Sequence, residues 1–398
     1  FFATAPVFFD QAGAVSIDVA FTTYTLAALA ALYTWHEKRD TRWLAVAAVL
    51  AGSACGIRHT GYLVCILLTA GVLVWGHEKR VIRTSMFAAM GLCAALPWLM
   101  RSALLVGNPV YPFFLSYFSK DVLPDVEVAQ IGSHFTMHGT GLIDLLLFPY
   151  NLIMRPYWFD GWSKSPGGAL LVFAPLGVLL GGRRVWPLIL YGIAGGVCFF
   201  YFQQVARYML PFFAAMMVVA AAGALRLHKL RPLVNALLVV LWSYGLLLGM
   251  ATVWFKVPVA FGMEDRDAYL TRRVDRYEAF KWVNENIPHD AVVYTLDPRS
   301  YFLHGRSYHN FMALTTVGRL PLDAQLKWLR ERDIQYILIP VTYVTSSERY
   351  REIGILDPIE QWRADRQHFR LQRRFELNTG GNPEIVELYE VLYPDNRD

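Results

Sequence analysis

The chain contains eight apolar segments whose lengths approach that of a membrane-spanning helix. A helix needs about 20 consecutive apolar residues to cross the hydrocarbon core of a bilayer. The segments cover residues 17–35, 42–57, 61–76, 85–105, 167–182, 185–202, 206–225 and 233–254. Only 17% of the residues are charged, whereas about a quarter are charged in an average soluble domain. The sequence therefore predicts a polytopic α-helical membrane protein.

Basic residues gather in every second connection between these segments. The sequences HEKRD, HEKRVIR, GRR and RLHKLR follow the first, third, fifth and seventh segments. Short loops rich in Lys and Arg stay in the cytoplasm, so we expect the other connections and both ends of the chain on the outer face. Because the basic residues between the apolar segments fall mostly in these short loops, the net charge of +5 does not predict nucleic acid as a partner.

The composition changes after the last apolar segment. We expect a membrane domain over residues 1–263 and a soluble α/β domain over residues 264–398, which are rich in Arg, Glu and Asp. In the second domain, apolar runs at 291–296 and 334–340 predict two parallel strands joined by a right-handed crossover. The stretches FRLQRRFEL and EIVELYEV predict a closing hairpin, and YEAFKWVNENIP predicts a helix that Pro288 ends.

The connection 106–166 is too apolar and aromatic for a free surface loop. Near its start, Pro109 cannot donate a backbone hydrogen bond and disfavours helical geometry at Asn108. We expect the fourth membrane helix to break there, so that the following aromatic segment, with Tyr111, folds back along the interface and lines a lipid groove. Residues 141–154 are expected to form a helix that lies in the interface.

Acidic residues near the start of the first segment are candidates for chemistry, because charges at membrane depth are costly. Asp18 opens this segment. One interpretation is a favourable interaction with the positive end of the helix dipole, and the other is a catalytic or metal-binding role. Asp10, in FFDQAG, is a second and weaker candidate.

Three arginines from separate segments share the predicted outer depth. They are Arg58, which precedes His59 in a tight turn, Arg101 and Arg207. An arginine at the amino end of a helix opposes the helix dipole, so the position of Arg207 indicates contact with an anion. The alternative is that these side chains extend to lipid headgroups. Guanidinium groups that meet at one leaflet predict a site for a lipid phosphate.

The spacing of the cysteine and histidine residues does not favour a metal site. The four cysteines lie in predicted membrane segments and are expected to be buried apolar residues rather than disulfides or metal ligands. His134 and His138 have the i, i+4 spacing of metal ligands on a helix. No Glu follows the first of them, and a glycine-flanked loop without metal is the favoured alternative.

Four stretches resemble a known family. They are APVFFDQAGAVSIDVAFTTYTLAALAAL, GSACGIRHTGYL, PWLMRSALLVGNPVYPFF and ARYMLPFF. In order and membrane placement they resemble bacterial GT-C glycosyltransferases, the group related to protein O-mannosyltransferases (family 39) and lipid A aminoarabinose transferases. The resemblance covers essentially the whole chain. It implies a GT-C-like helical bundle in the bacterial inner (cytoplasmic) membrane, with a carboxy-terminal α/β domain on the periplasmic side.

The resemblance also implies an activity. Such enzymes move a sugar from a polyprenyl-phosphate carrier to an acceptor on the outer face, with inversion; here the acceptor could be a protein, a lipid or a glycan. A divalent cation, Mg or Mn, is the expected cofactor if there is one. The implied catalytic residue is Asp18. The resemblance implies that Arg207 contacts the donor phosphate. From their shared depth and position we expect Arg101, Arg58 and His59 at the same phosphate, and Asn108, Tyr111 and Tyr208 along the donor cavity.

The family pattern is incomplete in this chain. The first acidic motif of the family normally lies in an outer loop upstream of the residues present here. We therefore interpret the chain as amino-terminally truncated and expect the catalytic base before residue 1.

Two other functions stay open from the sequence. A flippase or other transporter of a lipid-linked sugar or anion would also use arginines and broken helices. Transporters, however, bind near the bilayer midplane and often carry internal repeats, whereas the charges here lie at one face and no repeat is seen. A non-catalytic scaffold that keeps the fold is the third possibility.

Overall fold

The computed structural model contains two compact units. It describes residues 2–13, 16–76, 79–111, 113–118, 139–159, 161–297, 299–309, 311–346, 350–351, 354–379 and 382–393. The first unit falls within residues 1–113 and 134–257, and the second within residues 114–133 and 258–398. Each unit has its own hydrophobic core.

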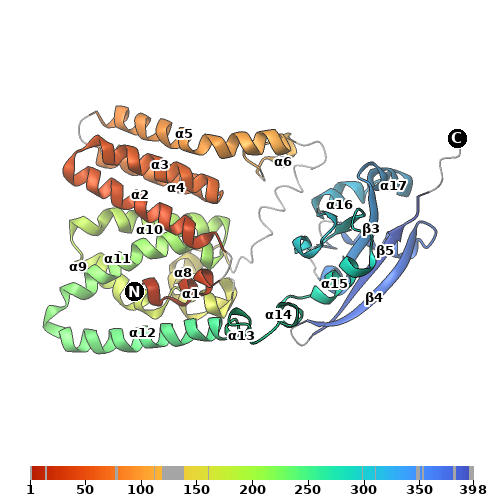
Figure 1. Ribbon diagram of the computed structural model, residues 1–398. Helices are drawn as coiled ribbons and strands as arrows, with labels where there is room; N and C mark the ends of the chain where they lie inside the picture. Colours follow the sequence, from red (N-terminus) through yellow and green to blue (C-terminus); the bar gives the residue numbers. More distant parts are fainter. Residues whose placement is uncertain are drawn as a thin grey trace. The chain divides into compact units, whose positions relative to one another are not determined.

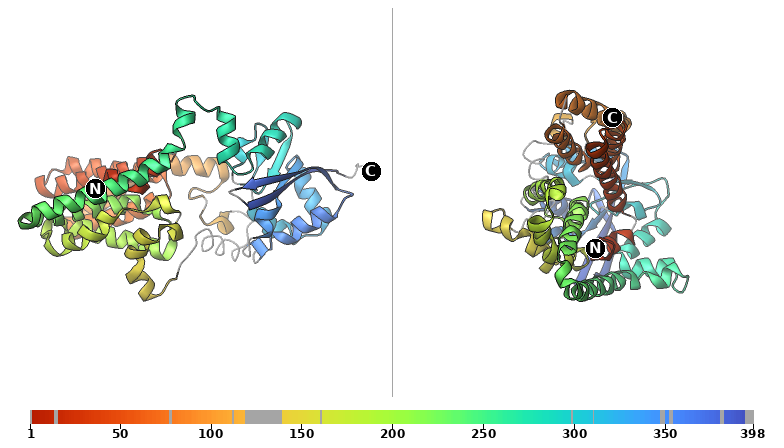
Figure 2. Two further views of the ribbon diagram at one scale, coloured as in Figure 1. Left: turned by 90° about the horizontal axis from the view of Figure 1, so that it is seen from below. Right: turned by 90° about the vertical axis from the view of Figure 1, so that its left-hand side faces the viewer.

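Each of the eight predicted apolar segments is a helix. The helices are α2 (Asp18–Lys38), α3 (Thr41–Ile57), α4 (Gly61–Trp75), α5 (Arg80–Val106), α9 (Gly168–Leu180), α10 (Trp186–Phe202), α11 (Leu210–Arg226) and α12 (Arg231–Trp254). Figures 1 and 2 show them running alongside one another within the first unit. Among the described residues, four helical stretches are long and apolar enough to cross a membrane, and they contain α5, α10, α11 and α12. The predicted polytopic helical architecture is confirmed.

Shorter elements connect these helices. They are η1 (Phe2–Thr4), α1 (Pro6–Ala12), α6 (Leu115–Phe118), α8 (Leu142–Met154), η2 (Pro156–Phe159), η3 (Trp162–Lys164), η4 (Arg183–Val185), η5 (Ala206–Met209) and η6 (His228–Leu230). The helix expected at 141–154 is α8, whereas α1 was not predicted. Of the four free cysteines, Cys93 on α5 is exposed, so the expectation that all four are buried is wrong for this residue.

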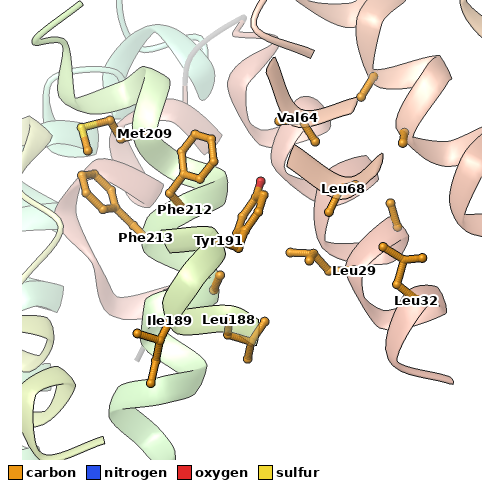
Figure 3. Packing of buried hydrophobic residues seen from close by; sticks show 14 of the residues in the cluster. Leu29, Leu32, Val64, Leu68, Leu188, Ile189, Tyr191, Met209, Phe212 and Phe213 are labelled. Carbon is orange, nitrogen blue, oxygen red and sulfur yellow. The ribbon is translucent and has the colours of Figure 1, made fainter. Parts of the chain in front are cut away.

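An aromatic and aliphatic core joins the helices of the first unit. Figure 3 shows Tyr191 of α10 between Phe212 of α11 and the side chains of Leu29 and Leu68, which belong to α2 and α4. The rings of Tyr191 and Phe212 lie 4.8 Å apart. This packing fixes α2 against α10 and α11, and so sets where the amino end of α2 lies.

Glycines allow α9 and α11 to pack with their backbones in contact. A Cβ added at Gly177 would lie 2.0 Å from the carbonyl oxygen of Val219, and one at Gly223 would lie 2.4 Å from the backbone nitrogen of Gly177. Small residues at such positions allow helices to approach closely in membranes, where the hydrophobic effect does not drive helix association.

We expect the Gly177→Ala variant to have a lower melting temperature in detergent than the parent protein. Alanine favours a helix by about 1 kcal/mol over glycine, but an overpacked methyl group costs about 1–3 kcal/mol. The control is Gly196→Ala on α10, because a Cβ there meets no atom within 4 Å. If both variants unfold at the same temperature, the close packing of α9 on α11 is not important for stability.

The second unit is an α/β domain, as predicted. Its strands are β1 (Val292–Thr295), β2 (Arg306–Tyr308), β3 (Ile334–Pro340), β4 (Phe369–Thr379) and β5 (Asn382–Val391). From residue 257 onward the helices are α13 (Val257–Ala260), α14 (Arg266–Arg273), α15 (Tyr277–Asn286), η7 (Ser300–Phe302), α16 (Phe311–Val317), α17 (Leu322–Glu331), α18 (Val341–Thr345) and α20 (Leu356–Ala364).

The five strands form one mixed sheet in the order β2-β1-β3-β5-β4. Strand β1 is parallel to β2 and β3, whereas β5 is antiparallel to β3 and β4. The predicted parallel pair and the predicted hairpin are both confirmed. Strand β2 was missed, because three residues without an apolar run carry no strand signal.

Helices cover both faces of this sheet. Neighbouring strand residues point to opposite faces: Tyr294 packs in a core with Trp362 of α20 and Leu329 of α17, whereas Val293 packs in a second core with Phe280 of α15. Figure 1 shows β4 and β5 as the longest strands of this unit. The carboxyl ends of the three parallel strands meet at one edge of the sheet.

Candidate functional site

The buried carboxylate of Asp18 forms an ion pair at the start of α2. Its partner is the Nη1 atom of Arg58, which follows the last turn of α3. Asp18 is 4% exposed, and the side chain of Arg58 is 14% exposed. The hydroxyl of Ser16 lies 2.9 Å from the other carboxylate oxygen. A charge buried this deeply requires a partner, so Arg58 and Asp18 are held as a unit.

Two guanidinium groups face the same tyrosine ring. The Cζ atom of Arg58 lies 3.5 Å from the centre of the Tyr208 ring, and the Cζ atom of Arg207 lies 5.3 Å from it. Tyr208 and Arg207 belong to η5, which precedes α11. Cations are attracted to the face of such a ring. The structure thus brings Asp18, Arg58, Arg207 and Tyr208 together from three parts of the chain.

A second acidic residue, Asp10 on α1, is also paired with a cation. Lys164 of η3 forms an ion pair with its carboxylate, and the hydroxyl of Ser163 lies 3.2 Å from it. The amide nitrogen of Gln11 donates a further hydrogen bond of 2.7 Å to Asp10.

The two acids belong to one polar network. The Ser16 hydroxyl lies within hydrogen-bond distance of both the Gln11 amide oxygen, at 2.6 Å, and the Asp18 carboxylate, at 2.9 Å. Because Gln11 also contacts Asp10, the network runs from Lys164 to Arg58. This network fixes the start of α2 relative to α1.

The chain after α5 is held by His59 and Asn108. The Nε2 atom of His59 donates a hydrogen bond of 2.6 Å to the backbone oxygen of Tyr111, and its ring contacts the edge of Phe113 at 5.6 Å. Asn108 is 2% exposed, and its amide donates to the backbone oxygen of Phe113 at 2.7 Å. The ring of Tyr111 is 47% exposed.

The break in this helix comes earlier than expected. We predicted it at Asn108 and Pro109, but α5 ends at Val106, and Gly107 closes it with a left-handed φ of 71°. Glycine is the residue that adopts this conformation at a helix end without steric cost. Pro109 then keeps the following chain from resuming the helix.

Arg101 lies apart from this arrangement. It is exposed on α5, beside a groove formed by residues of the same helix, among them Pro97 and Leu105. Within the part of the chain that the structure describes, no ion pair, hydrogen bond or ring contact joins Arg101 to Asp18, Arg58 or Arg207. Of the three arginines predicted to meet, the structure therefore places two at one ring and the third on an outer helix face.

The amino-terminal part of the chain matches one protein family. Residues 1–101 match the model of the family described as "Dolichyl-phosphate-mannose-protein mannosyltransferase". The matched stretch includes Asp10, Asp18 and Arg58. This part of the chain is therefore similar to GT-C glycosyltransferases. The predicted family resemblance is confirmed over residues 1–101, and the four long apolar helical stretches of the described residues fit the predicted multi-pass membrane protein.

A solved structure is similar to this chain at low sequence identity. It is the crystal structure of the Archaeoglobus fulgidus oligosaccharyltransferase complex with Zn and sulfate, with a TM-score of 0.43 and 13% identity. The similarity covers 93% of this chain and 54% of that chain, so this chain spans about half the length of that protein. None of the curated proteins matches this chain.

The described residues of this chain do not fit a divalent cation at the candidate site. They contain no group of three or more His, Cys, Asp or Glu side chains that could hold a metal ion. Asp10 and Asp18 each face a cationic side chain instead. His134 and His138, the metal ligands considered from spacing, lie outside the described residues.

Sequence reasoning missed three members of the polar network, which are Lys164, Gln11 and Ser16. One signal could have revealed Lys164. It is a basic residue in a connection expected on the outer face, where the charge pattern of membrane proteins disfavours cations, so its position calls for an acidic partner. Gln11 and Ser16 have no comparable signal, because they carry no charge that calls for a partner.

Proposed function

We propose that this protein transfers a sugar from a polyprenyl-phosphate carrier to an acceptor on the outer face of the bacterial cytoplasmic membrane, with inversion at the anomeric carbon. The observation that carries the proposal is the grouping of Asp18, Arg58, Arg207 and Tyr208 in a chain whose amino-terminal part is similar to GT-C glycosyltransferases. An acid beside two guanidinium groups supplies the two kinds of group that the reaction needs, a proton acceptor and an anion site.

The acceptor hydroxyl would lose its proton to a carboxylate as its oxygen bonds to the anomeric carbon. Of the residues that the structure describes, Asp18 is our candidate for this proton acceptor, rather than the upstream acid expected from the family pattern. In the structure its charge is paired with Arg58, so a bound donor phosphate would compete with Asp18 for that guanidinium. This competition frees the carboxylate only when the donor is present.

The bond from the anomeric carbon to the phosphate oxygen would break at the same time, and the polyprenyl phosphate would leave with the electron pair. Arg58 and Arg207 would stabilise this developing charge, because donors fixed in a water-poor site act strongly on it. We assign Tyr208 to holding both guanidinium groups in place by ring contact. Arg101, on the exposed face of α5, would contact the phosphate of the carrier at its approach from the lipid.

The segment after α5 would line the donor cavity. His59 and Asn108 hold this segment through backbone oxygens, so we assign them a positioning role. Tyr111, whose ring is exposed, would contact the isoprenoid chain. We propose residues 1–263 as the membrane domain that carries this site and residues 264–398 as an outer domain.

The direct test is consumption of a labelled donor. Purified protein in detergent, supplied with radiolabelled polyprenyl-phosphate mannose and a bacterial envelope extract as acceptor, should release polyprenyl phosphate and move the label to the acceptor fraction. A panel of donors with other sugars tests which sugar the protein transfers. If every donor stays intact while the label changes leaflet in reconstituted vesicles, the protein is a flippase and the proposal is wrong.

A further inference from the structure

Polar side chains of the second unit gather where its parallel strands end. Asp297 follows β1 by two residues, and Thr342 and Tyr343 follow β3 by two and three residues. Glu384 lies at the start of β5, which pairs antiparallel with the end of β3. In open α/β sheets, ligands bind in the crevice outside the carboxyl ends of the parallel strands.

Buried charges form the floor of this region. Arg276, which precedes α15, contacts Asp297 through its Nε atom and Glu384 through its Nη1 atom. The three residues are 7%, 1% and 6% exposed, respectively. Burying charges costs more than a packed apolar cluster of similar volume, and Arg276 also adopts a left-handed φ of 66°, which is unusual for a residue with a side chain.

Above this floor the structure has an open depression of about 440 Å³. Such a volume falls within the range of roughly 300–1,000 Å³ typical of small-molecule sites. Arg299 lies at its rim and bonds Asp275 at 2.9 Å and Asp297 at 3.0 Å. The residues that line the depression are Asp275, Arg276, Arg299, Thr342, Tyr343, Ser346, Asn382, Pro383 and Glu384.

The chemistry of the lining favours a neutral ligand rich in hydroxyl groups. Three carboxylates face two guanidinium groups, so the depression does not attract anions. The ring of Tyr343 is 42% exposed, with the Cζ atom of Arg276 5.0 Å from its centre. An exposed aromatic ring offers an apolar face, and the surrounding hydroxyl, amide and carboxylate groups offer hydrogen bonds to the ligand.

We propose that this depression binds a neutral saccharide. The saccharide would stack on the Tyr343 ring and bond to Asn382, Ser346 and the rim carboxylate of Asp275. If the protein is a glycosyltransferase, this ligand is the glycan part of the acceptor; that identification rests on the proposed function, whereas the binding site itself does not.

Binding to the full chain tests the proposal. The protein is purified in a detergent without a sugar headgroup and titrated with maltotriose, chitotriose and trigalacturonate, with ligand-observed NMR as the readout. We expect saturable binding of at least one of the two neutral trisaccharides and none of trigalacturonate. The Tyr343→Ala variant should weaken binding about tenfold, which corresponds to about 1.4 kcal/mol.

The matched control is Tyr301→Ala, which removes another exposed ring of the same domain from outside the lining and should bind as the parent does. No saturable binding of either neutral trisaccharide at about 10 mM, unchanged binding by Tyr343→Ala, or preferential binding of trigalacturonate would overturn the proposal. Failure of the proposed function is distinguishable, because the donor would then stay intact while the trisaccharide still binds.

Discussion

We expect the Asp18→Asn variant to transfer sugar about three orders of magnitude more slowly than the parent protein, while it still inserts and folds. General base catalysis contributes a factor of roughly 10²–10⁴ to the rate. Asparagine is close to aspartate in size, so the packing around the amino end of α2 is kept. It cannot accept the proton of the acceptor, and it leaves the guanidinium of Arg58 without its charged partner. The measurement is the transfer rate in detergent at saturating donor.

A control variant separates the loss of the proton acceptor from the general effect of removing an acid at the start of a helix. Asp40 is the N-cap of α3, where its carboxylate accepts a hydrogen bond of 2.9 Å from the Arg42 backbone N–H. Asparagine caps a helix as well as aspartate does, so Asp40→Asn should transfer at the parental rate. Full activity of Asp18→Asn, with the control also active, removes Asp18 from the chemistry.

Replacement of Arg207 by Ala should abolish transfer and leave the protein in the membrane. Removing one fixed donor from a site of developing negative charge typically costs 10²–10³ in rate, or about 2.7–4 kcal/mol. Arg207→Lys should recover only part of the activity, because an ammonium group keeps the charge but lacks the planar group that stacks on the Tyr208 ring. Rates of donor consumption and the amount of membrane-integrated protein are compared for each variant.

Two further variants serve as comparisons for Arg207→Ala. Arg183→Ala removes an exposed arginine from η4, in a connection expected on the cytoplasmic side, and should leave transfer unchanged. Arg101→Ala should reduce transfer less than Arg207→Ala does, because Arg101 is exposed on α5 and lies apart from the Asp18–Arg58 pair. Normal transfer by Arg207→Ala would refute the phosphate assignment.

Much of the architecture could be predicted from local patterns. The eight apolar segments coincide with helices, and four of these lie in described stretches long enough to cross a bilayer, which imposes both length and apolar composition on a spanning helix. The pairing of β1 with β3 followed from a strand, a helix and a second strand in succession, since such crossovers give parallel neighbours. Strand β2 and helix α1 are too short to leave a comparable pattern.

The candidate site was only partly predictable. Depth in the membrane pointed to Asp18, Arg58 and Arg207, because a charge there is costly whatever its partner is. The same argument selected Arg101, which the structure places on an exposed helix face. Depth gives the position of a residue along the membrane normal, but the direction of a side chain around its helix depends on how the helices pack.

Composition and charge order alone thus established a multi-pass helical protein with a soluble α/β part, because lipid and water each accept a different set of residues. Helix and strand packing established the rest: the ion pair of Asp18 with Arg58, the link from Asp10 to Lys164 and the depression beside Tyr343. Each joins residues that are far apart along the chain. Their contacts are set by three-dimensional packing, which no local pattern of residues records.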